Sequence, residues 1–188
     1  MDDLAITNTN QAIAGLTGAT VAIDDARTLL PKLGGLYAWW IVGPALTGVP
    51  ASAHPVEDGV GLLYVGIAPN GPGSKATLRS RVVGNHLDGN IATSTFRRTL
   101  AAFLDSPLQL APIKRGTKVV LSEVHNAKLS EWQRTHLRLT WYATTAPWVV
   151  EGRVIAALQP PLNLDKNEQH PFHPKVSGAR SLFRQRAR

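Results

Sequence analysis

Three segments of the chain combine aromatic and β-branched residues in short apolar runs, a pattern typical of strands. They are GLYAWWIV at 35–42, GVGLLYVGIA at 59–68 and LRLTWYAT at 137–144. Residues 43–59 are rich in glycine and proline, so they predict a long hairpin loop between the first two strands rather than a tight turn. TKVVLSEV at 117–124 indicates a further strand.

Other segments space their apolar residues at helical intervals. Pro31 ends the first predicted helix, and Pro147 occupies the favoured first turn of the last. Ser130 is predicted to cap the short helix that follows it. The predicted helices are IDDARTLLPKL at 23–33, LRSRVVGNH at 78–86, residues 93–105, LSEWQRTH at 129–136 and PWVVEGRVIAALQ at 147–159.

The composition describes an ordinary globular domain. The chain has 188 residues, 44% of them hydrophobic, and no apolar run approaches the roughly 18 residues of a membrane span. It contains no cysteine, which excludes disulfides and thiolate metal sites. Its first residues, MDDLAITNTN, are acidic and polar, unlike a secretory signal. We therefore expect a cytoplasmic protein without a membrane partner.

Charge is distributed unevenly along the chain. Residues 1–58 carry a net charge of −4, whereas residues 59–188 carry +11, which gives the overall +7. A basic segment of this size favours a polyanionic partner, because Lys and Arg release counterions when they neutralise phosphates. A basic surface that binds nothing is the alternative reading of charge alone.

Candidate chemistry lies in the same basic segment or just before it. Tyr37 and Tyr64 each stand in a predicted strand next to a glycine motif, Gly-x-Tyr in the first and Tyr-x-Gly in the second. Arg81 follows in the helix LRSRVVGNH, and Glu151 leads a later apolar helix that Asn163 closes twelve residues on, after two prolines. Phenols, an arginine and a carboxylate are suited to cutting a phosphodiester with one divalent cation.

The order and spacing of these motifs resemble the GIY-YIG endonuclease superfamily over residues 35–165. The phrases LYVGI, LRSR, LSEW and PLNLDKN are similar to those of its small stand-alone members. The resemblance implies an α/β (α+β) fold with a small three-stranded, mostly antiparallel sheet flanked by helices. Residues 33–166 would form the nuclease domain, between a helical N-terminal extension at 1–32 and a basic C-terminal tail at 167–188.

The resemblance also implies roles for individual residues. Glu151 would hold Mg²⁺ or Mn²⁺, and Arg81 would bind the scissile phosphate through its planar fork of donors. One tyrosine would handle the proton of the attacking water, with the choice between the two left open. The implied products carry 5′-phosphate and 3′-hydroxyl ends. The implied catalytic set is Tyr37, Tyr64, Arg81, His86, Glu151 and Asn163.

His86 departs from the family spacing. Members of the superfamily usually place a His or Tyr four residues after the arginine, whereas His86 stands five residues after Arg81. Either the helix ends at Gly84 and turns His86 inward, or Asn85 takes the expected position. A role for His86 in proton transfer or phosphate binding depends on the first arrangement.

A second departure concerns positive charge. Many members have a lysine directly after Tyr-x-Gly, where this chain has Ile67, so Lys75 in the loop at 69–75 is the predicted substitute. Arg79 lies two residues from Arg81 on the helix, so it is predicted to face the nucleic-acid backbone, or else plain solvent. The residues predicted to contact nucleic acid are Lys75, Arg79, Arg97 and Arg98.

We therefore expect a divalent-metal-dependent endonuclease that acts on DNA, with RNA left open. A separate DNA-reading module is not recognisable, so specificity would come from the loops, a homodimer or an accessory protein. The alternative is a nucleic-acid-binding protein that keeps the fold without turnover, which Ile67 and the shifted His86 favour. Three further alternatives concern single features or the whole chain. Glu151 would be an ordinary acid in the first turn of a helix, Asn163 would only end a helix, or the chain would be a structural domain that binds a partner.

Overall fold

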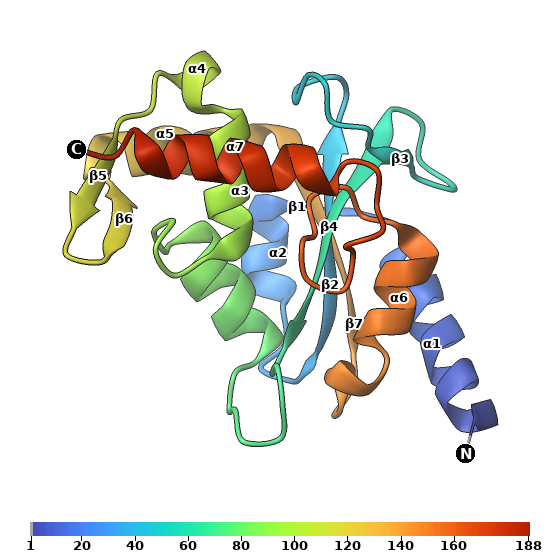
Figure 1. Ribbon diagram of the computed structural model, residues 1–188. Coiled ribbons are helices and arrows are strands. Elements are labelled where there is room, and N and C mark those ends of the chain that lie inside the picture. The colour runs from blue at the N-terminus through green and yellow to red at the C-terminus, as the bar shows by residue number, and fades with distance from the viewer. Residues whose placement is uncertain (1) are drawn as a thin grey trace.

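An antiparallel sheet runs through the middle of the molecule and carries helices on both faces (Figure 1). The structure is a computed structural model that describes residues 2–188, with side chains from Ile6 onward. Met1 and the side chains of residues 2–5, part of the predicted N-terminal extension, lie outside it. The strand order is β1-β7-β2-β4-β3. The strands are β1 (Val21–Ala22), β2 (Gly35–Val42), β3 (Ser52–Ala53), β4 (Val60–Ala68) and β7 (Leu137–Ala143).

The sheet has five strands, whereas the sequence predicted three. The three long strands β7, β2 and β4 are the predicted ones, and they are adjacent and antiparallel. The two added strands are two residues long and sit at the edges, with β1 paired to β7 and β3 paired to β4. Such short strands have no apolar periodicity, so only the tertiary pairing reveals them.

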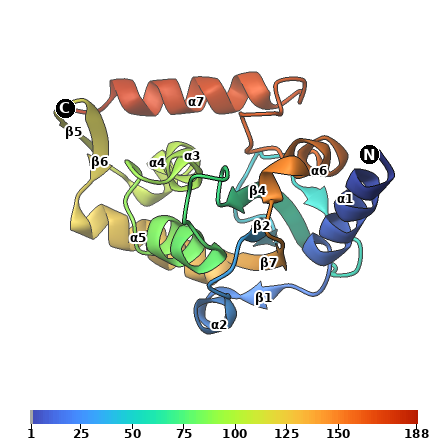
Figure 2. The same cartoon turned by 90° about the horizontal axis from the view of Figure 1, so that it is seen from below.

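Two helices cover one face of the sheet, α1 (Asp2–Leu16) and α6 (Glu151–Leu158). Leu36, Ala38 and Trp40 of β2 pack on this side with residues of α1 and α6. The opposite face carries α2 (Ile23–Leu29), η1 (Ser80–Leu87), α3 (Thr95–Phe103) and α5 (Glu123–His136), as Figure 2 shows. Within residues 2–188, no helix is long and apolar enough to cross a membrane.

Trp39 and Trp40 point to opposite faces of β2, because successive side chains of a strand alternate. Trp39 belongs to the core beneath α3 and Trp40 to the core beneath α1 and α6. Both are buried, with 0% and 1% exposure. Both faces of the sheet are therefore packed, and neither tryptophan is exposed.

A β-bulge interrupts the pairing of β2 with β4. Trp39 pairs with Tyr64, but Trp40 pairs with Leu62, so Leu63 is the extra residue. Leu63 and Tyr64 consequently pack on the same face of the sheet, against the core that also contains Tyr37. The bulge shifts the alternation of side chains between the two faces of β4. Tyr64 therefore lies on the same face as Tyr37, and the residues on either side of Tyr64 stay buried.

The helices after η1 differ in detail from the prediction. A short helix α4 (Asp105–Leu108) follows α3, and a separate hairpin of β5 (Pro112–Arg115) and β6 (Lys118–Leu121) precedes α5. The cap of α5 is Ser122, whose Oγ accepts the His125 N–H, and not Ser130, which lies inside the helix and donates to the carbonyl of Leu87. A 3₁₀ turn, η2 (Pro147–Val149), carries Pro147 and leads into α6.

The predicted basic tail is a helix, α7 (His173–Gln185), which lies alongside α3 (Figures 1 and 2). Val176 and Phe183 are buried at 0% and 3% exposure, and they attach the helix to the core. These two residues stand seven apart, so they share one helical face. The arginines between and after them obscured this short apolar stripe in the sequence.

Gly66→Ala is expected to lower the free energy of unfolding by about 1–3 kcal/mol, the usual cost of overpacking a core. A Cβ at Gly66 would lie 2.4 Å from the Tyr37 hydroxyl and 2.5 Å from the ring carbon that bears it. Urea unfolding measures the change. Gly71→Ala, where a Cβ meets nothing within 4 Å, is the matched control. Equal stability of the two variants would contradict the close packing of Tyr37 on Gly66.

Candidate active site

The two tyrosines come from neighbouring strands on one face of the sheet. Tyr37 of β2 pairs directly with Gly66 of β4, and its ring lies over that glycine. Gly35 is equally constrained, because a Cβ there would lie 2.2 Å from the Tyr142 carbonyl oxygen of β7. The glycines of both motifs therefore allow close approach, by a ring at Gly66 and by a neighbouring strand at Gly35.

Arg81 and His86 come from η1, which is a π-helix. Its hydrogen bonds join residues five apart, as in the bond from the Asp88 N–H to the Val83 carbonyl. A π-helix therefore places residues i and i+5 on one face, where an α-helix would place i and i+4. Neither predicted arrangement holds, because the helix continues past Gly84 to Leu87 and Asn85 does not line the cavity. The π-helical geometry itself brings the buried His86 to the site.

A chain of hydrogen bonds fixes the imidazole of His86. Its Nε2 lies 2.7 Å from the Tyr37 hydroxyl, and its Nδ1 lies 2.6 Å from the Ser94 Oγ. Ser94 is also the N-cap of α3, where its Oγ accepts the Arg97 N–H at 3.0 Å. Ser94 was not in the predicted catalytic set, although residues 93–95 read equally as a capped helix start or as hydrogen-bond donors to phosphate. Its position just before a helix, which indicates a cap, was the available signal.

Glu151 is the first residue of α6, a helix on the sheet face opposite to η1 and α3. Its side chain is 16% exposed and forms an ion pair with the Lys166 ammonium, whose side chain is 46% exposed. Lys166 lies in the loop after Asn163 with a left-handed φ of 60°. It was not predicted, and nothing in its local sequence marks it as a neighbour of Glu151.

A cavity of about 150 Å³ lies among these side chains. It brings together five of the six predicted catalytic residues from two strands, the π-helix and α6. Ile67, Asn70, Thr93 and Thr95 complete its wall, the last two at the start of α3. The five are Tyr37, Tyr64, Arg81, His86 and Glu151.

Asn163 lies outside the cavity. Its Oδ1 accepts the Val65 N–H at 2.9 Å, and its Nδ2 donates to the Val65 carbonyl at 2.8 Å. Both bonds are buried. Asn163 therefore acts on the site through β4, next to Tyr64, and fixes the loop after α6 against that strand.

Arg97 requires a correction, since it was predicted to contact nucleic acid. Its side chain is fully buried, and its guanidinium donates to the carbonyls of His86 and Leu87 at 3.0 and 2.9 Å and to Gln133 and Asn126. Burial lowers the pKa of Arg97 to about 10, so it remains charged at neutral pH. The buried fork satisfies the carbonyls at the end of η1 and is not available to a ligand.

The other three residues predicted to contact nucleic acid lie at or near the surface. Lys75 is exposed in the loop before η1. Arg79 is half-buried and donates to the Thr28 carbonyl at 3.3 Å, beside α2. Arg98 is half-buried and donates to the carbonyls of Ile91 and Ala92. None of the three lines the small cavity, and nucleic-acid contact by each stays a prediction.

Burial shifts the pKa values of both tyrosines and of His86 toward their neutral forms. It raises the pKa of Tyr37 well above 10, with a further contribution from Tyr64. It raises the pKa of Tyr64 to about 12, with Glu151 adding to the effect. Burial and the neighbouring Arg81 lower the pKa of His86 to about 3, so its imidazole is neutral at pH 7. A neutral imidazole can accept a hydrogen bond from the Tyr37 hydroxyl.

The donor set suits a hard divalent cation held by few protein ligands. Glu151 is the only carboxylate in the cavity wall, and the described residues contain no group of three or more His, Cys, Asp or Glu that could hold a metal. Mg²⁺ keeps several waters and is commonly bound through one or two carboxylates together with substrate phosphates. Arg81 Nε is buried without a hydrogen-bond partner in the described structure, as expected of a donor that receives an anion.

A family model described as the GIY-YIG catalytic domain matches residues 35–182, from the first strand of the site through most of α7. Comparisons with curated proteins and with solved structures gave no significant match.

The titration of His86 predicts a pH-dependent stability. Its pKa is about 3 when folded and about 6.5 when unfolded. Its contribution is therefore fully present above about pH 6.5 and is lost as the pH falls toward 3, by at most about 1.4 kcal/mol per pH unit. His86→Gln should flatten this part of the profile in urea unfolding between those limits. His136→Gln on α5 is the control and should keep the slope. An unchanged slope in His86→Gln would contradict a neutral buried imidazole.

Proposed function

This chain belongs to the family of GIY-YIG catalytic domains, and from that premise we propose that it is a divalent-metal-dependent endonuclease that hydrolyses DNA phosphodiester bonds. The observation that carries the proposal is the cavity that joins both tyrosines to Arg81, His86 and Glu151. Domains of this family are typical of endonucleases, so a nucleic-acid substrate follows at the family level. The metal and the mechanism are the proposed part.

Arg81 would bind the scissile phosphate. Its Nε lies buried at the cavity without a partner among the described residues. A guanidinium can donate two parallel hydrogen bonds to phosphate oxygens, and these are stronger in a buried site than in water. The charge that accumulates on those oxygens during cleavage strengthens the contact in the transition state.

Tyr37 is the better candidate for handling the proton of the attacking water. Neither phenol ionises readily near pH 7, because burial raises both pKa values. Only Tyr37 has a neutral imidazole at hydrogen-bond distance, so its hydroxyl can donate a hydrogen bond to His86 while the phenol oxygen accepts one from the attacking water. A bound phosphate would raise the pKa of His86, opposing the effect of Arg81. Ser94 would hold the ring in the required orientation.

Glu151 would hold the cation, which when bound stabilises the negative charge on the phosphate oxygens. Lys166 now neutralises that carboxylate. Its side chain is nearly half exposed, and ion pairs of this kind contribute only about 0–1 kcal/mol. Lys166 can therefore release Glu151 and offer its ammonium to the phosphate, which would compensate for Ile67 in the cavity wall.

A nucleic-acid-binding protein without turnover is the second candidate. Ile67 lines the cavity where many family members are expected to carry a lysine, and Lys166 occupies the carboxylate proposed to hold the metal. Both features favour binding over cleavage. The test below separates the two functions, since a pure binder does not cut DNA at any metal concentration.

Glu151→Ala is expected to reduce metal-dependent nicking of supercoiled plasmid by roughly 10³-fold, which corresponds to about 4 kcal/mol of transition-state stabilisation. Linear duplex and branched DNA are incubated in parallel, each with Mg²⁺, Mn²⁺ or EDTA. Glu131→Ala, an exposed residue of α5, is the control for loss of one carboxylate. DNA binding in EDTA should persist in both variants. Absence of cutting by the wild type on all substrates, with binding intact, would favour the second candidate.

Lys166→Met is expected to raise the affinity for divalent cations without substrate by roughly fivefold, since the cation no longer competes with an ion pair of about 1 kcal/mol. Mn²⁺ binding measured by electron paramagnetic resonance gives the affinity independently of activity. Lys175→Met, an exposed residue of α7 whose ammonium lies over the Phe172 ring, is the control. Weaker or unchanged Mn²⁺ binding would show that Glu151 does not hold the cation in competition with Lys166.

A further inference from the structure

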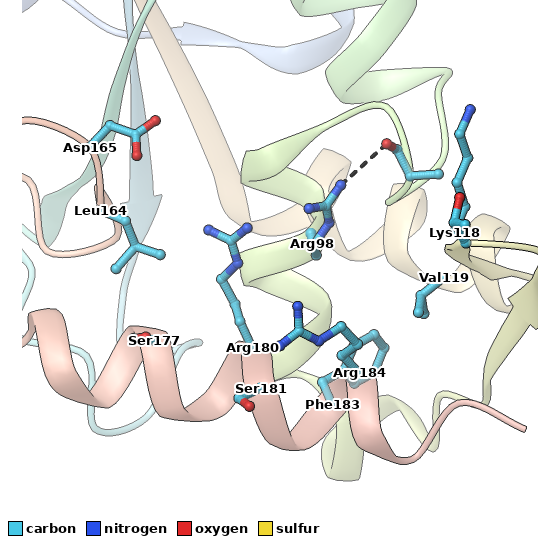
Figure 3. A pocket seen from close by; sticks show the side chains of 12 residues that line it. Arg98, Lys118, Val119, Leu164, Asp165, Ser177, Arg180, Ser181, Phe183 and Arg184 are labelled. Carbon is cyan, nitrogen blue, oxygen red and sulfur yellow. Dashed lines mark hydrogen bonds between the residues drawn. The ribbon is translucent and has the colours of Figure 1, made fainter.

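A second and larger cavity, of about 550 Å³, lies between α3, α7, β6 and the loop after Asn163. Four cationic side chains line it and only one acidic side chain does. We refer to it as the α7 pocket. Figure 3 shows the three arginines reaching into the same space. The charged residues of the wall are Arg98, Arg180, Arg184, Lys118 and Asp165.

The packing of α7 creates this concentration of charge. Val176 and Phe183 are buried on the side of α7 that packs on the core. Arg180 and Arg184 stand four residues apart, so they occupy one face of the helix. Like charges at this spacing destabilise a helix slightly, and here both also face Arg98 of α3 (Figure 3). An anion in the pocket would relieve that repulsion.

The two α7 arginines of the pocket form no ion pair with the described residues. Within residues 6–188, neither Arg180 nor Arg184 has a carboxylate within ion-pair distance, whereas Arg186, the residue just after α7, pairs with Asp105. Arg180 is half-buried, whereas Arg184 is exposed. The pKa of Arg180 is lowered by burial first and by Arg98 second, and Asp165 opposes both effects. Burial of an unpaired guanidinium costs free energy, which a multiply hydrogen-bonded anion would recover.

Consecutive residues link the α7 pocket to the active-site cavity in two places. Ala92 lines the pocket and the next residue, Thr93, lines the cavity. On the other side, Asp165 lines the pocket and the next residue, Lys166, pairs with Glu151. A strand that crosses the active site can therefore continue into the α7 pocket without leaving the surface.

We propose that the α7 pocket binds a backbone phosphate of the substrate strand, beside the phosphate that is cleaved. The proposal rests on the function proposed above. Arginine forks suit phosphate oxygens, and contacts of this kind position a nucleic acid without reading its sequence. Arg81 is the one arginine among the described residues that line the small cavity. The α7 pocket thus provides additional phosphate contacts that hold the strand.

The test measures binding of fluorescein-labelled DNA by anisotropy, with a duplex of about 20 base pairs and the single strand of the same sequence. All proteins carry Glu151→Ala and are kept in EDTA, so that no cutting occurs. Arg180→Gln with Arg184→Gln should weaken binding by roughly tenfold and lower the slope of log K against log salt by about 1–2, because one or two fewer counterions are released.

The control changes the same charge on the opposite side of the molecule, with Lys128→Gln and Arg134→Gln on α5. It should bind within about twofold of the parent. A second variant, Arg180→Lys with Arg184→Lys, keeps the charge and removes the fork, so it should retain most of the salt slope while losing affinity. Equal losses in the control and the Gln pair, or parental binding by the Gln pair, would overturn the proposal.

Failure of this proposal is distinguishable from failure of the nuclease. Plasmid nicking is measured with the arginine pair exchanged and Glu151 intact. If the wild type never cuts DNA, and DNA binding is weakened in the Gln pair but not in the control, the phosphate site is supported and the nuclease is not. If the wild type cuts DNA, and the Gln pair binds and cuts like the wild type, the nuclease is supported and the phosphate site is not.

Discussion

Two buried hydrogen bonds between the Asn163 side chain and the main chain of Val65 hold the second half of the site against the sheet. They fix the loop after α6 next to the strand that carries Tyr64. Glu151 begins the helix before this loop, and Lys166 and the Asp165 wall of the α7 pocket follow it. Both cavities therefore depend on one amide that pairs with a strand, at a position where a buried main-chain group needs a partner.

The π-helix is the second constraint. It places residues five apart on one face of the helix. His86 therefore reaches Tyr37, where an α-helix would present a different residue. Arg97 stabilises the end of this helix, because its buried guanidinium donates hydrogen bonds to the carbonyls of His86 and Leu87. An arginine that looks like a nucleic-acid contact in the sequence is in fact part of the scaffold, whereas its neighbour Arg98 reaches the α7 pocket.

Sequence patterns identified the parts that obey local rules. The three long strands have continuous apolar and aromatic runs, and two of them carry Tyr37 and Tyr64. The helix led by Glu151 follows from its proline and its apolar period. The edge strands β1 and β3, the bulge at Leu63 and the helix α7 were not predicted, since each depends on pairing or packing with residues distant along the chain.

The sequence by itself thus determined the strands, the main helices, the family resemblance and the residue types of the site. The tertiary structure alone decided which of those residues meet. It placed His86 inside and Asn163 outside the cavity, buried Arg97, and brought Lys166 to Glu151 and the α7 arginines to Arg98. Local propensity depends on neighbours in the chain, whereas burial and the pairing of charges depend on which surfaces the whole fold closes together.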